Sequence, residues 1–181
     1  MNIYEYTPQK SNKKALGTII VLFSLATGIF LFAMIFPEIK FRWVLQLISI
    51  IAFVAIIFII SRYIAKSFLY AIVQNDDENL DFTVTEITNA GRTQITTCRI
   101  ALANIEKSYL LDRSIPEHVE TLKALQKSAK SEGRKSFNYC PDINPTEVCV
   151  ILVEECGEKF LLKLSPDATL WEYLKKDKRE I

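Results

Sequence analysis

The chain has 181 residues, of which 50% are hydrophobic and 24% are charged. These averages hide a division, because residues 1–61 carry only 5 Lys or Arg and 2 acidic residues, whereas residues 62–181 carry 17 basic and 19 acidic residues. The composition excludes a disordered chain and a simple soluble globule, and the near-neutral second part argues against a nucleic-acid-binding domain.

Two uncharged apolar runs, at 15–37 and 43–61, dominate the first third of the chain. A bilayer core about 30 Å thick needs about 20 helical residues, and both runs are long enough. They predict transmembrane helices at about 15–36 and 43–62. The link at 37–42 is short, so the two helices form an antiparallel hairpin.

The sequence therefore predicts a cytoplasmic N-terminal segment at 1–14, a transmembrane hairpin at 15–62 and a cytoplasmic domain at 63–181. Basic residues set the orientation of such a hairpin. Five flank its two ends and two lie in its loop, namely Lys10, Lys13, Lys14, Arg62 and Lys66 against Lys40 and Arg42. This balance predicts a multi-pass protein of the inner (cytoplasmic) membrane with both termini in the cytoplasm.

Aromatic residues at the ends of the two runs predict anchors at the membrane interface. Phe41 and Trp43 lie at the loop end, and Tyr63 lies at the other end with Phe68 and Tyr70. A cleaved signal peptide is the rival interpretation of the first run, but the apolar character continues past the small residues that would mark cleavage. The hairpin has no ionisable residue within its helices, which argues against an ion pathway.

The four cysteines, Cys98, Cys140, Cys149 and Cys156, form no Cys-x-x-Cys pair, and their spacing matches no zinc or redox motif. In a cytoplasmic domain we expect them to be reduced and structural.

Short strands separated by turns are predicted after the hairpin, because apolar and polar residues alternate and β-branched residues are common. The expected strands are 67–73, 80–85, 93–102, 105–111, 137–140, 147–154 and 159–164. The last two flank 155–158, which predicts a tight hairpin. The segment 116–130 is predicted to be a helix or a mobile arm.

A C-terminal amphipathic helix is predicted after the last strand. Ser165 can cap it, Pro166 suits its first position, and Leu170, Trp171 and Leu174 give it one apolar face. The fold class is thus an α+β membrane protein, with a two-helix hairpin followed by a small antiparallel β-barrel or sheet that the last helix closes.

This order of elements resembles that of bacterial membrane-anchored pleckstrin-homology-like proteins of the YcxB-like type. Residues 160–174 resemble their last strand, Pro-containing turn and closing helix, and 96–100 with 105–106 resemble their middle strands. The resemblance implies a non-enzymatic cytoplasmic domain at the membrane and transfers no site residues. The segment 116–146 departs from a minimal barrel.

Few residues suggest catalysis or metal binding. His118 is the single histidine and is expected to be a solvated surface residue. Asp76, Asp77, Glu78 and Asp81 could attract a divalent cation but lack the EF-hand order, so a solvated turn is favoured. The sequence contains no phosphate-binding loop. We therefore expect no enzyme activity, no cofactor and no metal.

Five basic residues gather within thirteen positions as a candidate contact with lipid headgroups. They are Lys123, Lys127, Lys130, Arg134 and Lys135. A solvated helix face is the alternative interpretation of this cluster.

These features predict an interaction module that docks a protein partner, or its own copy, at the membrane through a peptide groove between a strand and the last helix. The alternative is an accessory or immunity-type subunit of a larger membrane complex that acts through its hairpin. The expected partners are the lipid bilayer and an unidentified membrane or cytoplasmic protein, with a homo-oligomer possible and no nucleic acid.

Overall fold

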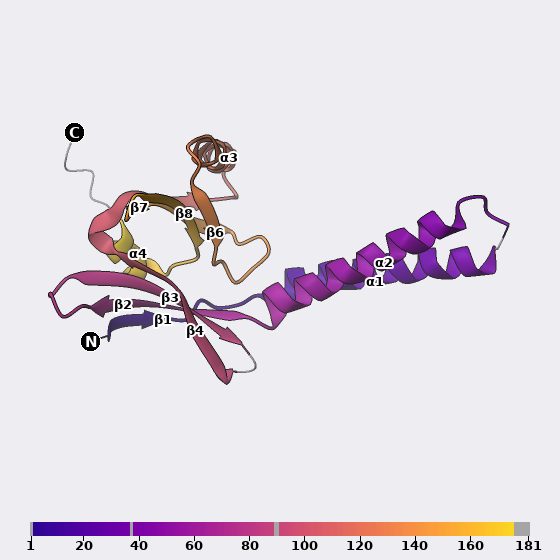
Figure 1. Cartoon of the computed structure of the whole chain (residues 1–181), viewed down its shortest axis with the longest axis horizontal. Helices are drawn as coiled ribbons and strands as arrows, with labels where there is room; N and C mark the ends of the chain where they lie inside the picture. The colour runs from indigo at the N-terminus through magenta and orange to yellow at the C-terminus, as the bar shows by residue number, and fades with distance from the viewer. Residues whose placement is uncertain (1, 37, 89–90, 176–181) are drawn as a thin grey trace. The chain divides into compact units, whose positions relative to one another are not determined.

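A computed structural model describes residues 2–36, 38–88 and 91–175 (Figure 1). The chain divides into two compact units. Residues 11–66 form a helical unit, and residues 1–10 with 67–181 form a strand unit. Each unit is described by itself below.

The helical unit is a hairpin of α1 (Asn12–Ile35) and α2 (Arg42–Ile59), and α2 continues as a π-helix, η1 (Ile60–Ile64). Both helices are long and apolar enough to cross a membrane, which confirms the two predicted apolar helices. Small residues allow the helices to approach: Ala26 and Ser49 are fully buried, and the Ser49 hydroxyl donates to the Ala26 carbonyl at 2.7 Å.

The first sheet of the strand unit, sheet one, has the strand order β1-β2-β3-β4, with all neighbours antiparallel. Its strands are β1 (Asn2–Tyr6), β2 (Ser67–Gln74), β3 (Leu80–Thr88) and β4 (Thr93–Ala101). A β-bulge lies in the β3–β4 pairing, where Val84 faces Cys98 and Thr85 faces Thr96. Thr97 is thus the extra residue, and its edge strand bends there.

Strand β1 was not predicted from the sequence, which led us to expect a cytoplasmic segment at 1–14 without a strand. It lies before the helical hairpin but pairs with β2, which follows the hairpin, and Tyr6 faces Tyr70 in this pairing. Tyr4 and Tyr6 pack against the core of the strand unit. The strand unit therefore begins before the hairpin, and its second part begins at Ser67 rather than at residue 63.

The second sheet, sheet two, has the order β5-β7-β8-β6. Its strands are β5 (Ile105–Asp112), β6 (Lys135–Asn138), β7 (Glu147–Glu155) and β8 (Glu158–Leu164), and β6 runs parallel to β8. Cys156 and Gly157 join β7 to β8 with φ angles of 52° and 77°. Both residues lie in the left-handed region that two-residue hairpin turns require, so the predicted tight hairpin is confirmed.

A closed barrel is not formed by the described strands, and this corrects one of the two forms that the sequence analysis allowed. The consecutive strands β4 and β5 belong to different sheets because a 3-10 turn, η3 (Leu102–Asn104), separates them. The antiparallel arrangement with a C-terminal helix is confirmed, apart from the parallel β6. The strands β4 and β6 remain at the edges of their sheets.

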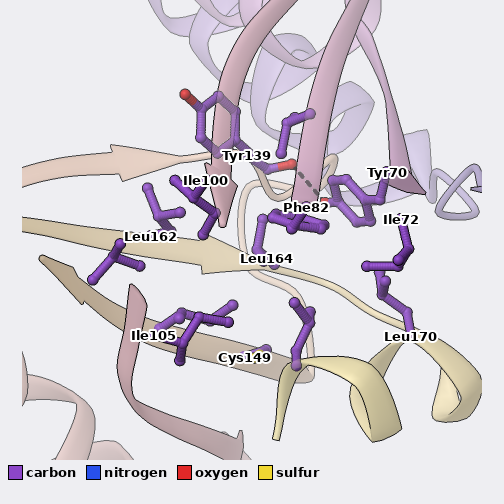
Figure 2. Close-up of a cluster of buried hydrophobic side chains, with 14 of the residues drawn as sticks. Tyr70, Ile72, Phe82, Ile100, Ile105, Tyr139, Cys149, Leu162, Leu164 and Leu170 are labelled. Atoms are coloured by element: carbon purple, nitrogen blue, oxygen red, sulfur yellow. Dashed lines mark hydrogen bonds between the residues drawn. The ribbon is translucent and has the colours of Figure 1, made fainter. Parts of the chain in front are cut away.

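The main core lies between the two sheets (Figure 2). Tyr70 and Phe82 of sheet one and Ile151 and Leu164 of sheet two are fully buried in it. Phe68 is also buried, so the prediction that Phe68 and Tyr70 anchor at the membrane interface is corrected. These two rings enter the core because they alternate with outward-facing residues along β2.

A second core on the other face of sheet two explains the unbroken apolar run of β7. Val148 and Val150 pack there, against Leu122 and Ala129 of α3 (Pro116–Ser131). Residues 116–130 therefore form a helix rather than a mobile arm, and Pro116 in its first turn suits a helix start.

The C-terminal helix α4 (Ala168–Leu174) inserts Leu170 and Leu174 into the main core. Its cap differs from the prediction of Ser165 and Pro166. Asp167 is the N-cap, and its carboxylate accepts from the Leu170 amide at 2.9 Å. An Asp at this position satisfies an otherwise unpaired donor, so the helix starts there.

Candidate functional site

A concave site lies at the edges of the two sheets, and we call it the β4–β6 cleft. It has a volume of about 340 Å³. Its lining residues come from β4, from β6 with the residue after it, and from the β7–β8 hairpin. They are Thr97, Cys98, Arg99, Ile100, Phe137, Tyr139, Glu155, Cys156, Glu158, Phe160 and Leu162.

Aromatic side chains form one wall of the cleft. Phe137 stacks on Tyr139, with ring centroids 6.2 Å apart and an interplanar angle of 11°, and lies 6.0 Å from Phe160. Phe137 is 40% exposed on β6, at the edge of sheet two. An exposed ring in an apolar depression is the usual anchor of a contact surface.

Tyr139 fixes the cleft by joining both sheets. Its hydroxyl donates to the Thr97 carbonyl of β4 at 3.5 Å, and its amide donates to the Lys163 carbonyl of β8 at 2.9 Å. Its own carbonyl accepts from the buried Tyr70 hydroxyl at 2.9 Å (Figure 2). The cleft wall is therefore held by the core rather than by a free loop.

Two titratable groups in the cleft are kept neutral. Burial raises the pKa of the Cys98 thiol to about 11, and burial raises the pKa of Tyr139 to about 12. Both shifts favour the protonated, uncharged form of the group. The arrangement suits binding of an apolar group.

Charges on the rim are unequally compensated. Arg99 contacts Asp81 at 2.7 Å, and Lys135 on β6 contacts Glu158 at 2.7 Å. Glu155 is half-buried and makes no ion pair within the described part of the chain. The rim thus offers one uncompensated carboxylate.

The five basic residues predicted to contact lipid separate into two groups. Lys123, Lys127 and Lys130 are exposed on α3. Arg134 differs from the expectation: its side chain is only 6% exposed, and its guanidinium pairs with Glu106 at 2.8 Å and with Glu132 at 2.7 Å. Both Arg134 and Lys135 therefore form ion pairs within the protein, the second with Glu158.

The three exposed lysines of α3 give a testable prediction. In nanodiscs, acylation of Lys123, Lys127 and Lys130 should be at least about threefold slower with anionic than with zwitterionic lipid, because each lysine near an anionic surface gains about 1 kcal/mol. Mass spectrometry of the acylated protein measures this, with the exposed Lys107 on β5 as the control. High salt should abolish the difference. Equal slowing at all four lysines would contradict lipid contact by α3.

The other singled-out residues have local roles. Phe41 and Trp43 are more than 60% exposed at the loop end of the helical unit, and the Arg62 guanidinium lies 5.4 Å from the Tyr63 ring centroid in η1. His118 accepts a hydrogen bond from the Asp112 amide at Nδ1 (3.0 Å) and so joins β5 to α3.

The acidic residues of the β2–β3 turn are not gathered into a metal site. Asp81 is buried in β3 and pairs with Arg99, whereas Asp76 and Asp77 lie in the turn before β3. No group of three potential metal ligands occurs among the described residues. The described cysteines form no disulfide with one another; Cys140 and Cys149 are buried, and Cys156 is exposed on the cleft.

Sequence reasoning missed the cleft, and placed its expected groove between a strand and the last helix. The available signal was weak: Phe137 and Tyr139 alternate within a short predicted strand, directly before a Pro-containing loop. Nothing in the sequence placed that strand near β4, about forty positions earlier. Comparisons with family models, curated proteins and solved structures found no match to the chain.

Proposed function

We propose that the protein is a membrane-anchored, non-catalytic interaction module whose strand unit docks a protein partner at the cytoplasmic membrane. The observation that carries this proposal is the β4–β6 cleft, where an exposed aromatic ring lines an apolar depression at two sheet edges. The pleckstrin-like resemblance remains part of the proposal, with two separate sheets in place of a closed barrel.

The strand pairing supports an anchor with both termini on one side of the membrane. The chain enters the helical hairpin from β1 and leaves it into β2, and these two strands are hydrogen-bonded to each other. A hairpin that crosses the membrane would therefore have both of its ends on the same side. The excess of Lys and Arg at these ends favours the cytoplasmic side.

The chemistry of the cleft supports binding rather than catalysis. Cys98 is a neutral thiol there, and His118 lies at the β5–α3 junction and not in the cleft lining. Nucleophilic catalysis by cysteine needs an activated thiolate with a base in hydrogen-bond reach.

Two variants separate the proposed docking unit from the alternative, an accessory or immunity-type subunit that acts through its hairpin. Phe137→Asp places a charge in the cleft, and a second variant exchanges α1 and α2 for an unrelated two-helix hairpin. After crosslinking in cells and purification in mild detergent, we expect Phe137→Asp to lose the co-purifying partner and the hairpin exchange to keep it.

Each of the two variants has its own control. The exchanged hairpin must retain an even number of spans, because β1 and β2 have to meet on one side. Lys107→Asp introduces the same residue at an exposed site on β5, away from the cleft lining, and should keep the partner. Loss of the partner on hairpin exchange, with retention in Phe137→Asp, would establish the alternative instead.

A further inference from the structure

We propose that the occupant of the β4–β6 cleft is an extended segment of a partner protein, which adds as a strand to the free edge of β4. This segment places an apolar side chain in the cleft and a basic side chain against Glu155. This inference rests on the proposed function and names the chemistry of the partner. It follows from three observations on the edge, the cleft and the rim.

The edge of β4 is open for pairing. Its other edge is bonded to β3, and from Ile95 to Arg99 no backbone hydrogen bond to a further strand occurs within the described residues. The Thr97 carbonyl points from the bulge toward the cleft, since it accepts from the Tyr139 hydroxyl. Ile95 is 58% exposed on this strand. Open edges of this kind bind an added strand through main-chain hydrogen bonds.

The size of the cleft fits side chains of such a strand. Its volume of about 340 Å³ lies at the low end of ligand pockets, which range over about 300–1,000 Å³. Phe137, Phe160 and Leu162 offer it apolar contacts. One or two large apolar side chains fill this space, and main-chain bonds to β4 supply the rest of the affinity.

The charges on the rim favour a basic side chain on the same face of the added strand as the apolar one. Arg99 pairs with Asp81, and Lys135 pairs with Glu158, so among the charged residues that line the cleft Glu155 is the one for which the described part of the chain shows no ion pair. The neutral Cys98 and Tyr139 add no charge. A Lys or Arg on the added strand would therefore meet Glu155 and gain a charge-assisted hydrogen bond.

A second copy of this chain fits the rim less well. Its own β4 carries one basic residue, Arg99, which is already paired with the buried Asp81 at 2.7 Å. Pairing of two β4 edges would thus leave each Glu155 without a partner. A separate protein is therefore the favoured occupant.

The test uses the full-length protein in nanodiscs and fluorescent synthetic peptides of about seven residues, the length of a typical strand. The lead peptide alternates Thr and Val and has a central Phe with a Lys two positions later, because alternate residues of a strand share one face. Two further versions carry backbone N-methyl groups at alternate positions, one on each edge of the extended peptide. Because alternate amides point to opposite edges, only one methylation pattern should weaken binding, by at least about tenfold.

Charge reversal tests the rim. Glu155→Lys should weaken binding of the lead peptide by about tenfold and strengthen binding of a version with Glu in place of Lys. Glu120→Lys makes the same charge change on the exposed face of α3 and should leave both affinities unchanged. Slow alkylation of the buried Cys149 in each variant would show that the strand unit is folded.

The outcomes separate this inference from the proposed function. If both methylated peptides bind like the lead peptide, or if Glu155→Lys does not change the charge preference, strand addition with a basic residue is wrong even where Phe137→Asp still loses the cellular partner. A dimer of the full-length protein that Ile95→Lys dissociates would make a second copy the occupant and overturn the inference. Loss of the partner on hairpin exchange alone would overturn the proposed function itself.

Discussion

Replacing Tyr70 by Ala is expected to lower the free energy of unfolding of the strand unit by about 3–5 kcal/mol. Tyr70 is fully buried, and its ring lies 6.1 Å from Phe82 in the core between the sheets. Its hydroxyl donates to the Tyr139 carbonyl and accepts from the Ser165 amide at 3.4 Å. Tyr70 thus joins sheet one to the segments that follow β6 and β8.

Tyr70→Phe separates the hydroxyl from the ring. It should cost about 1–3 kcal/mol, because it leaves the buried Tyr139 carbonyl and the Ser165 amide without this partner. Tyr173→Phe removes the same hydroxyl from a ring that is 37% exposed, and should change stability by less than about 0.5 kcal/mol. The readout is alkylation of the buried Cys149 against urea concentration. Equal stability of Tyr70→Phe and the unchanged protein would show that the hydroxyl does not join these segments.

Deletion of residues 2–6 is expected to lower the stability of the strand unit by at least about 3 kcal/mol, although α1 and α2 stay intact. Tyr4 donates a hydrogen bond to the Asp167 carboxylate at the start of α4 and stacks on Tyr173 at 6.2 Å. Tyr6 packs against Tyr70. Each aromatic pair adds about 0.5–1.5 kcal/mol, and the deletion also removes the backbone hydrogen bonds between β1 and β2.

A pair of shortened chains tests the same role of β1 without the hairpin. One joins residues 1–10 to 67–181 through a short Gly/Ser linker, and the other is 67–181 alone. The linked chain should protect Cys149 from alkylation at higher urea concentration than the chain without β1. Indistinguishable urea midpoints would contradict a structural role for β1.

The elements that sequence predicted well are those with a local cause. The apolar runs of α1 and α2, the β7–β8 hairpin with Gly157 in its turn, and the helix from Pro116 each follow from composition, periodicity or turn chemistry. The N-cap of α4 is Asp167 and not the predicted Ser165, because several residues there can cap a helix. The packing of Leu170 in the core decides between them.

The elements that sequence missed depend on distant partners. β1 has five residues and two half-buried tyrosines, and it becomes a strand because the edge of β2 is available. In the sequence, Arg134 belongs to a basic run that suggests an exposed cation. In the structure its guanidinium forms ion pairs with Glu106 of β5 and with Glu132. The β4–β6 cleft likewise forms only where the edges of two sheets approach each other, so no single sequence motif could predict it.

Site-specific photocrosslinking in cells tests the central claim, that the partner docks at the β4–β6 cleft. A benzophenone amino acid would replace Phe137 in the cleft, Lys127 on α3, or Val54, which is 60% exposed on α2. We expect one discrete protein adduct from position 137, mapping to an extended segment of the partner that has Lys or Arg two positions from an apolar residue. Adducts from position 54 with none from position 137 would contradict docking at the cleft.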